Sequence, residues 1–176
     1  AYTFFAAQGK NVSHSLVEED KKEISLKLLQ EAENKSLSFL LPFDHVVAEA
    51  PEKGQKTEIV EGLPIPKSMM ALDIGPHTRK TYREIISKAR TIFWNGPMGV
   101  FEIPEFANGT MEIAHAIADS SALSVIGGGD SVAAVAKAGV SSKINHISTG
   151  GGASLEYIAL GTLPGLEALR RKDNDF

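Results

Sequence analysis

In the second half of the chain, short apolar runs alternate with segments of helical character. Strands are expected at 91–94, 123–126 and 144–148, and helices at 108–119, 131–138 and 153–160. Such short connections between alternating strands and helices favour a parallel sheet that is covered by helices on both faces. The alternation therefore predicts an α/β fold.

The first half of the chain carries weaker and less regular signals. A helix is expected at 2–7. A second is expected to start at a capping-box pattern at 15–18 and to run to about residue 33, and a third to start at a cap formed by Thr78. Further strands are expected at 37–41, 46–48 and 69–74, and disorder at 170–175. Only the second half is therefore regular enough to predict how its strands pair.

Two glycine triplets, at 127–129 and 150–152, stand in the same context. Each follows a predicted strand and opens a predicted helix. Glycine lets the backbone approach a ligand closely, and the start of a helix offers unpaired N–H groups and the positive end of a dipole. Together the triplets favour a cradle for a phosphorylated ligand. The competing interpretation is that both are only flexible turns.

Three loops follow predicted strands of the parallel sheet, namely 95–99 and the two glycine triplets. Ligands of open parallel sheets bind beyond the carboxyl ends of the strands, so these loops are expected to converge on one site. The sequence contains no Walker A loop, because no glycine directly precedes a Lys-Ser/Thr pair. The glycine triplets also lack the spacing of a dinucleotide-binding fingerprint.

Four polar side chains near these loops each have two interpretations. Asp130 is either a ligand of a magnesium ion that bridges to a phosphate or a plain helix N-cap. Ser131 and Thr149 either cap their helices or bond a phosphate oxygen. Glu102 either accepts hydrogen bonds from ribose hydroxyls or is an ordinary exposed glutamate.

Composition excludes several other classes of function. The net charge of -4 argues against a general surface for nucleic acid or anionic membranes, although a local anion site is compatible with it. The chain has no cysteine, which removes disulfides, thiol catalysis and zinc–thiolate sites. No apolar run approaches the ~20 residues of a membrane span.

Six motifs, in a consistent order and spacing, resemble those of phosphoglycerate kinases. They are Leu40-Leu41-Pro42 with Asp44, Asp73-Ile74-Gly75-Pro76, the segments 93–102, 126–131 and 148–156, and Leu163-Pro164-Gly165. The resemblance covers essentially the whole chain and corresponds to most of the family's C-terminal, nucleotide-binding lobe. It implies a Rossmann-like three-layer α/β sandwich with a mostly parallel sheet, incomplete at its N-terminal side.

The resemblance also implies an activity. Members of the family are cytoplasmic glycolytic kinases, expected to be monomers, that transfer a phosphoryl group between 1,3-bisphosphoglycerate and ADP. The products are 3-phosphoglycerate and ATP, and the reaction uses Mg²⁺. Neither a nucleic acid nor a membrane is an expected partner.

By the same resemblance, Asn95, Gly96 and Pro97 lie beside the nucleotide, Glu102 takes the ribose and Leu72 packs on the adenine. The phosphate side is assigned to the turns and the residues next to them. Gly128, Gly129, Asp130 and Ser131 match the metal–phosphate loop, with Asp130 as the magnesium ligand. Thr149 is assigned to the nucleotide, and Gly150, Gly151 and Gly152 match the helix start that faces the transferring phosphoryl group.

The chain departs from the family's pattern at its start. The lysine-bearing Gly-Gly-Ala-Lys stretch that opens the lobe is missing, as is the N-terminal lobe with its basic substrate cluster. Residues 1–176 are therefore expected to be a fragment of the parent enzyme that is inactive alone. The competing hypotheses are a stand-alone module that binds phosphorylated ligands without catalysis, and a different transferase that uses the same cradle.

Overall fold

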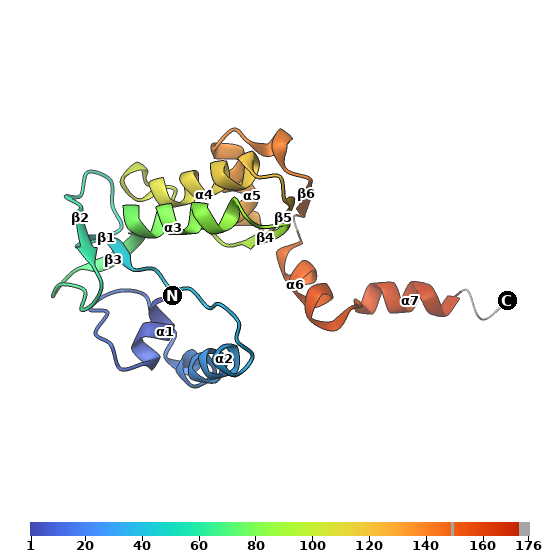
Figure 1. Cartoon of the computed structure of the whole chain (residues 1–176), viewed down its shortest axis with the longest axis horizontal. Helices are drawn as coiled ribbons and strands as arrows, with labels where there is room; N and C mark the ends of the chain where they lie inside the picture. Colours follow the sequence, from blue (N-terminus) through green and yellow to red (C-terminus); the bar gives the residue numbers. More distant parts are fainter. Residues whose placement is uncertain (149, 173–176) are drawn as a thin grey trace. The chain divides into compact units, whose positions relative to one another are not determined.

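The computed structural model describes residues 1–148 and 150–172 (Figure 1). The chain divides into two compact units. The first unit comprises Ala1–Glu84 and Met98–Ile113. The second comprises Ile85–Pro97 and the chain from Ala114 onward. Both units combine helices with a three-stranded sheet, which confirms the predicted α/β class.

The sheet of the first unit is antiparallel, with the strand order β2-β1-β3. Its strands are β1 (Asp44–Ala48), β2 (Glu58–Glu61) and β3 (Met70–Ile74). All five residues of β1 are buried, because neighbouring strands cover both of its edges and apolar side chains pack on it. Val46, Ala48 and Leu72 form a core cluster with Phe106.

The first unit also contains helices, of which α1 packs against α2. They are α1 (Tyr2–Ala7), the 3₁₀ helix Glu19–Lys21, α2 (Lys22–Asn34), α3 (Pro76–Ile86), the 3₁₀ helix Pro104–Phe106 and α4 (Asn108–Asp119). Residues of α3 and α4 belong to both units.

The sheet of the second unit is parallel, with the order β4-β5-β6, as the alternation predicted. Its strands are β4 (Thr91–Asn95), β5 (Leu123–Gly127) and β6 (His146–Ser148). The helices of this unit are α5 (Gly129–Lys137), the 3₁₀ helix Ser141–Lys143, α6 (Gly151–Leu160) and α7 (Pro164–Lys172). Thus α4 and α5 provide the crossover connections that parallel strands require.

Several predictions for the first half were wrong. The run at 37–41 is not a strand, because none of the described strands pairs with it and the side chains of Leu37, Phe39 and Leu40 are exposed. The exposed edge strand β2 was not predicted, because it has only two apolar residues between its glutamates. The capping box is absent, and α2 starts at Lys22 without a side-chain cap.

Two further predictions need correction. Thr78 lies inside α3, where its hydroxyl bonds Asp44 instead of capping the helix. The tail predicted to be disordered begins inside α7, which extends to Lys172, and 173–176 lie outside the described residues.

Candidate functional site

The parallel sheet brings the three predicted loops to one edge. Asn95 at the end of β4 is in register with Gly127 at the end of β5, and Gly127 with Ser148 at the end of β6. The predicted convergence of these loops at the carboxyl ends of the strands is therefore confirmed.

The two glycine turns pack directly against each other. A Cβ on Gly151 would lie 2.5 Å from the Cα of Gly128 and 3.1 Å from Oδ1 of Asn95. Gly128 has a φ of 90° and would itself place a Cβ 2.6 Å from the same Asn95 oxygen. Only glycine fits at these two positions, so close packing rather than flexibility explains them.

Each turn leads straight into a helix. Gly128 is the N-cap of α5 and Gly150 is the N-cap of α6, and no side chain caps either helix. The first N–H groups of a helix have no partner within the helix, and the helix dipole favours negative charge beside them. Two uncapped helix starts at one edge of a sheet form a suitable place for phosphate oxygens.

Ser131 has a structural role that neither interpretation anticipated. Its side chain is fully buried, and its Oγ accepts a 2.6 Å hydrogen bond from the N–H of Gly96. The bond ties the loop after β4 to the first turn of α5. Thr149 lies outside the described residues.

Asp130 lies in the first turn of α5 and is exposed. Because Gly128 occupies the N-cap position, the interpretation of Asp130 as an N-cap is wrong. No hydrogen bond or ion pair within the described part of the chain engages its carboxylate. The described residues also contain no cluster of three or more His, Cys, Asp or Glu able to hold a metal. A metal here needs ligand oxygens from elsewhere.

Two of the residues implied by resemblance, Leu72 and Glu102, belong to the first unit. Leu72 is 8% exposed and packs in the core cluster against Val100 and Ile103. Glu102 is exposed in a turn that follows Val100. Asn95, Gly96 and Pro97 belong to the second unit.

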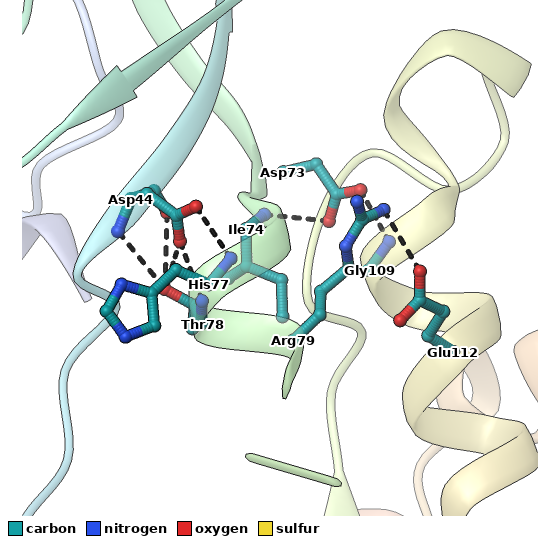
Figure 2. A network of polar contacts seen from close by, with 8 residues as sticks. All are labelled: Asp44, Asp73, Ile74, His77, Thr78, Arg79, Gly109 and Glu112. Atoms are coloured by element: carbon teal, nitrogen blue, oxygen red, sulfur yellow. Dashed lines mark hydrogen bonds and ion pairs between the residues drawn. The ribbon is translucent and has the colours of Figure 1, made fainter. Parts of the chain in front are cut away.

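Two buried aspartates of the first unit were not recognised as functional or structural centres. Each is only 2% exposed, and each accepts hydrogen bonds from the start of a helix (Figure 2). Asp44 accepts bonds from the N–H of His77 at 2.8 Å, the N–H of Thr78 at 2.7 Å and the Thr78 hydroxyl at 2.6 Å. Burial raises the pKa of Asp44, but these bonds outweigh it and leave the pKa below the usual value.

The Asp73 carboxylate occupies a less polar position. It accepts hydrogen bonds from the N–H of Gly109 at 2.6 Å and from the N–H of Ile74 at 2.8 Å. Burial raises its pKa to about 6, in spite of these bonds and of the nearby Arg79. Arg79 pairs with Glu112 at 3.4 Å, as Figure 2 shows. The only sequence signal for both aspartates was their presence in motifs of the resemblance.

Comparison with known proteins decides the family. The family model described as phosphoglycerate kinase matches residues 1–160. This chain belongs to the phosphoglycerate kinase family. Among curated phosphoglycerate kinases, that of Prosthecochloris aestuarii is 57% identical over 96% of this chain, and that of Clostridium botulinum (strain Hall) is 52% identical over 97%.

Solved phosphoglycerate kinases share the fold as well. The structure from Coxiella burnetii matches with a TM-score of 0.90 and 37% identity, and covers 94% of this chain. The structure from Pyrococcus horikoshii matches with a TM-score of 0.75 and 40% identity, and covers 99%. The chain spans 43% of the length of the two curated phosphoglycerate kinases and 43% and 44% of the two solved chains.

None of the helices in the described part of the chain is both long enough and apolar enough to cross a bilayer.

Proposed function

We propose that this chain supplies the magnesium–nucleotide site of a phosphoglycerate kinase. The reaction is phosphoryl transfer between 1,3-bisphosphoglycerate and ADP, which gives 3-phosphoglycerate and ATP. The observation that carries the proposal is the joint placement of Asn95, the turn before α5 and the turn before α6 at one edge of the parallel sheet. Family membership supports the choice of substrates.

The backbone provides the phosphate side of the proposed site. The N–H groups at the start of α5, near Gly129, and those at Gly151 and Gly152 are donors directed by two helix dipoles. Phosphoryl transfer depends on positioning and on stabilising charge over the transferring group. In this proposal the turn at Gly150 faces that group, and the turn at Gly128 holds the phosphates of the nucleotide.

Asp130 fits the role of a magnesium ligand. Its carboxylate is exposed at the mouth of the turn and unengaged within the described chain. Mg²⁺ in kinases is typically held by one or two carboxylates together with substrate phosphates, so a single aspartate is sufficient from the protein. When bound, the ion neutralises phosphate charge.

We assign the nucleoside side to Asn95, Gly96, Pro97, Glu102 and Leu72, as the resemblance implies. Asn95 ends β4 and Gly96 and Pro97 follow it, and the bond from Gly96 to Ser131 fixes this loop. Glu102 is exposed and has the chemistry to accept hydrogen bonds from ribose hydroxyls. Leu72 offers an apolar contact for a base, although most of its side chain is buried in the core. Thr149 completes the proposed set.

Cations for catalysis are scarce in the described site. Between Asn95 and Gly152 the only lysines or arginines are Lys137 and Lys143. Lys143 pairs with Asp119 at 2.9 Å, and Lys137 lies in the last turn of α5, away from its start. An added arginine contributes about 10³ to 10⁵ in rate in comparable enzymes. We therefore propose that residues 1–176 alone do not transfer phosphate, and that parts of the family's length outside this chain bind the acid substrate.

The test is the substitution Asp130→Asn in the full protein that carries this sequence. The variant keeps the shape of the side chain and removes its charge, so activity in a coupled assay with 1,3-bisphosphoglycerate and Mg-ADP should fall by about 100-fold or more. The melting temperature should move little, because the side chain is exposed. Asp20→Asn is the matched control, because Asp20 is also an exposed aspartate at the start of a helix but lies elsewhere in the sequence. Full activity of Asp130→Asn at ordinary magnesium concentration would contradict the assignment.

The competing hypothesis of a binding module predicts a different result. The full protein would bind Mg-ADP but show no turnover. The monomeric state and the cytoplasmic location implied by the resemblance are part of the proposal, and light scattering of the full protein checks the first of them.

A further inference from the structure

The buried carboxylate of Asp73 lies against the segment that leads to Glu102. The segment Met98–Val100 is held by hydrogen bonds at each of its residues. The N–H of Val100 donates to the carbonyl of Leu72 at 2.9 Å. The N–H groups of Met98 and Gly99 donate to Oγ1 of Thr110 at 3.0 and 3.3 Å. Thr110 belongs to α4, so this segment is bound to both β3 and α4.

The Asp73 carboxylate fills the space between these elements. A Cβ on Gly99 would lie 2.6 Å from Oδ1 of Asp73 and would collide with the carbonyl of Leu72. A Cβ on Gly109 would collide with the same Oδ1. The backbone at both glycines therefore rests on the carboxylate, which also accepts the N–H of Gly109. The position of the segment therefore depends on this carboxylate together with the carbonyl of Leu72 and the hydroxyl of Thr110.

We propose that Asp73 is a positioning residue for the nucleoside part of the nucleotide. The inference rests on the proposed function, because Glu102 is the assigned partner of the ribose. Asp73 sets the path of Met98–Val100 and thereby the place of Glu102, two residues further on. The phosphate turns belong to the second unit, and in this inference their affinity for phosphate does not depend on Asp73.

The test compares two probes in the full protein that carries this sequence. Adenosine reports on the nucleoside side alone, and magnesium pyrophosphate reports on the phosphate side alone. Asp73→Asn should weaken the binding of adenosine about tenfold in calorimetry. The amide has one acceptor oxygen, whereas the N–H groups of Gly109 and Ile74 bond to different oxygens of the carboxylate. Pyrophosphate affinity should stay within about twofold. In kinetics, the KM for ADP should rise with kcat nearly unchanged.

Gly99→Ala is the second variant, because it keeps the carboxylate and displaces the segment. Its affinity for adenosine should fall by the same factor, and its affinity for pyrophosphate should stay unchanged. Gly165→Ala is its control, since a Cβ at Gly165 meets no atom within 4 Å. Asp44→Asn removes an equally buried carboxylate of the same sheet, and should cost stability without changing adenosine affinity.

Each outcome bears on the inference. The inference is overturned if both Asp73→Asn and Gly99→Ala bind adenosine as tightly as the wild type. It is also overturned if both variants lose affinity for adenosine and for pyrophosphate to the same extent. If Asp73→Asn does not fold, Gly109→Ala takes its place, because its Cβ would collide with Oδ1 of Asp73. If the wild-type protein binds pyrophosphate and ADP, and the variants bind adenosine as tightly as the wild type does, the proposed function stands without a role for Asp73. A wild type that binds neither probe overturns the proposed function and this inference together.

Discussion

The two units treat the starts of their helices in opposite ways. In the first unit, Asp44 and Asp73 place buried carboxylates on the N–H groups that open α3 and α4. In the second unit, α5 and α6 begin without any side-chain cap, and Asp130 is exposed. A helix start stabilises the fold where the protein supplies the anion, and remains available to a ligand where it does not.

The largest expected effect concerns the first unit. Asp44→Ala leaves the N–H groups of His77 and Thr78 and the Thr78 hydroxyl without their acceptor. Since an unsatisfied buried donor costs about 1–3 kcal/mol, we expect a loss of about 4 kcal/mol in the free energy of unfolding, measured in urea. Asp130→Ala, at the start of α5, should lose under about 1 kcal/mol. If both variants lost the same free energy of unfolding, the buried and the exposed aspartate would not differ in their contribution to stability, and the contrast between the units would be wrong.

The second effect separates the two buried aspartates by pH. The folded pKa of Asp73 is raised to about 6 from 3.8, so the folded state holds an extra proton between these values. Stability should therefore fall as the pH rises from about 4 to about 6, by up to about 3 kcal/mol. Asp73→Asn should lack this fall.

Asp44 should behave in the opposite sense. Its folded pKa is lowered, so its contribution is present at neutral pH and is lost as the pH falls below about 4. The destabilisation caused by Asp44→Asn should shrink in acid. Urea titrations of both variants at several pH values check the two signs, and a shared sign would contradict the difference in their surroundings.

The third effect lies in the second unit. Gly151→Ala forces a methyl group onto the backbone of Gly128 and must separate the two turns. Misplacement by about 1 Å costs about 100-fold in rate, so we expect kcat in the full protein to fall by that order. Gly165→Ala is the control, since its Cβ would lie in open space. A Gly151→Ala enzyme with normal turnover would show that the turns are flexible after all.

The smallest effect tests the link between the loop after β4 and α5. Ser131→Ala leaves the N–H of Gly96 without its acceptor and should cost about 1 kcal/mol of unfolding free energy. Ser142→Ala, at an exposed serine, should cost nothing measurable. Thermal unfolding of both variants provides the measurement, and an equal melting temperature for the two would mean that the bond contributes no stability.

The sequence predicted the second unit better than the first, for a physical reason. The bounds of α4 were predicted residue for residue, and β4, β5 and β6 were found, because short connections and apolar periodicity are local signals. The glycine triplets predicted a close approach of the backbone to a ligand, whereas the contact of Gly151 with the backbone of Gly128 was not predicted.

The first unit depends on partners that are distant in the sequence. The strand β1 pairs with β2 and β3, whereas the apolar run at 37–41 pairs with none of the described strands. An aspartate in a strand gives no local sign that a helix start will bury it. Asp44 meets residues of α3, and Asp73 meets Gly109 of α4, and only the folded chain brings them together.

The contact of Asp73 with Gly99 and Gly109 also constrains how this chain can diverge. A larger residue at either glycine collides with the carboxylate while Asp73 is present. Replacing Asp73 by a smaller residue removes the acceptor for the N–H of Gly109, and a Cβ at Gly99 would still collide with the backbone carbonyl of Leu72. Single steps away from this trio are therefore all unfavourable, so the three positions are expected to be inherited together.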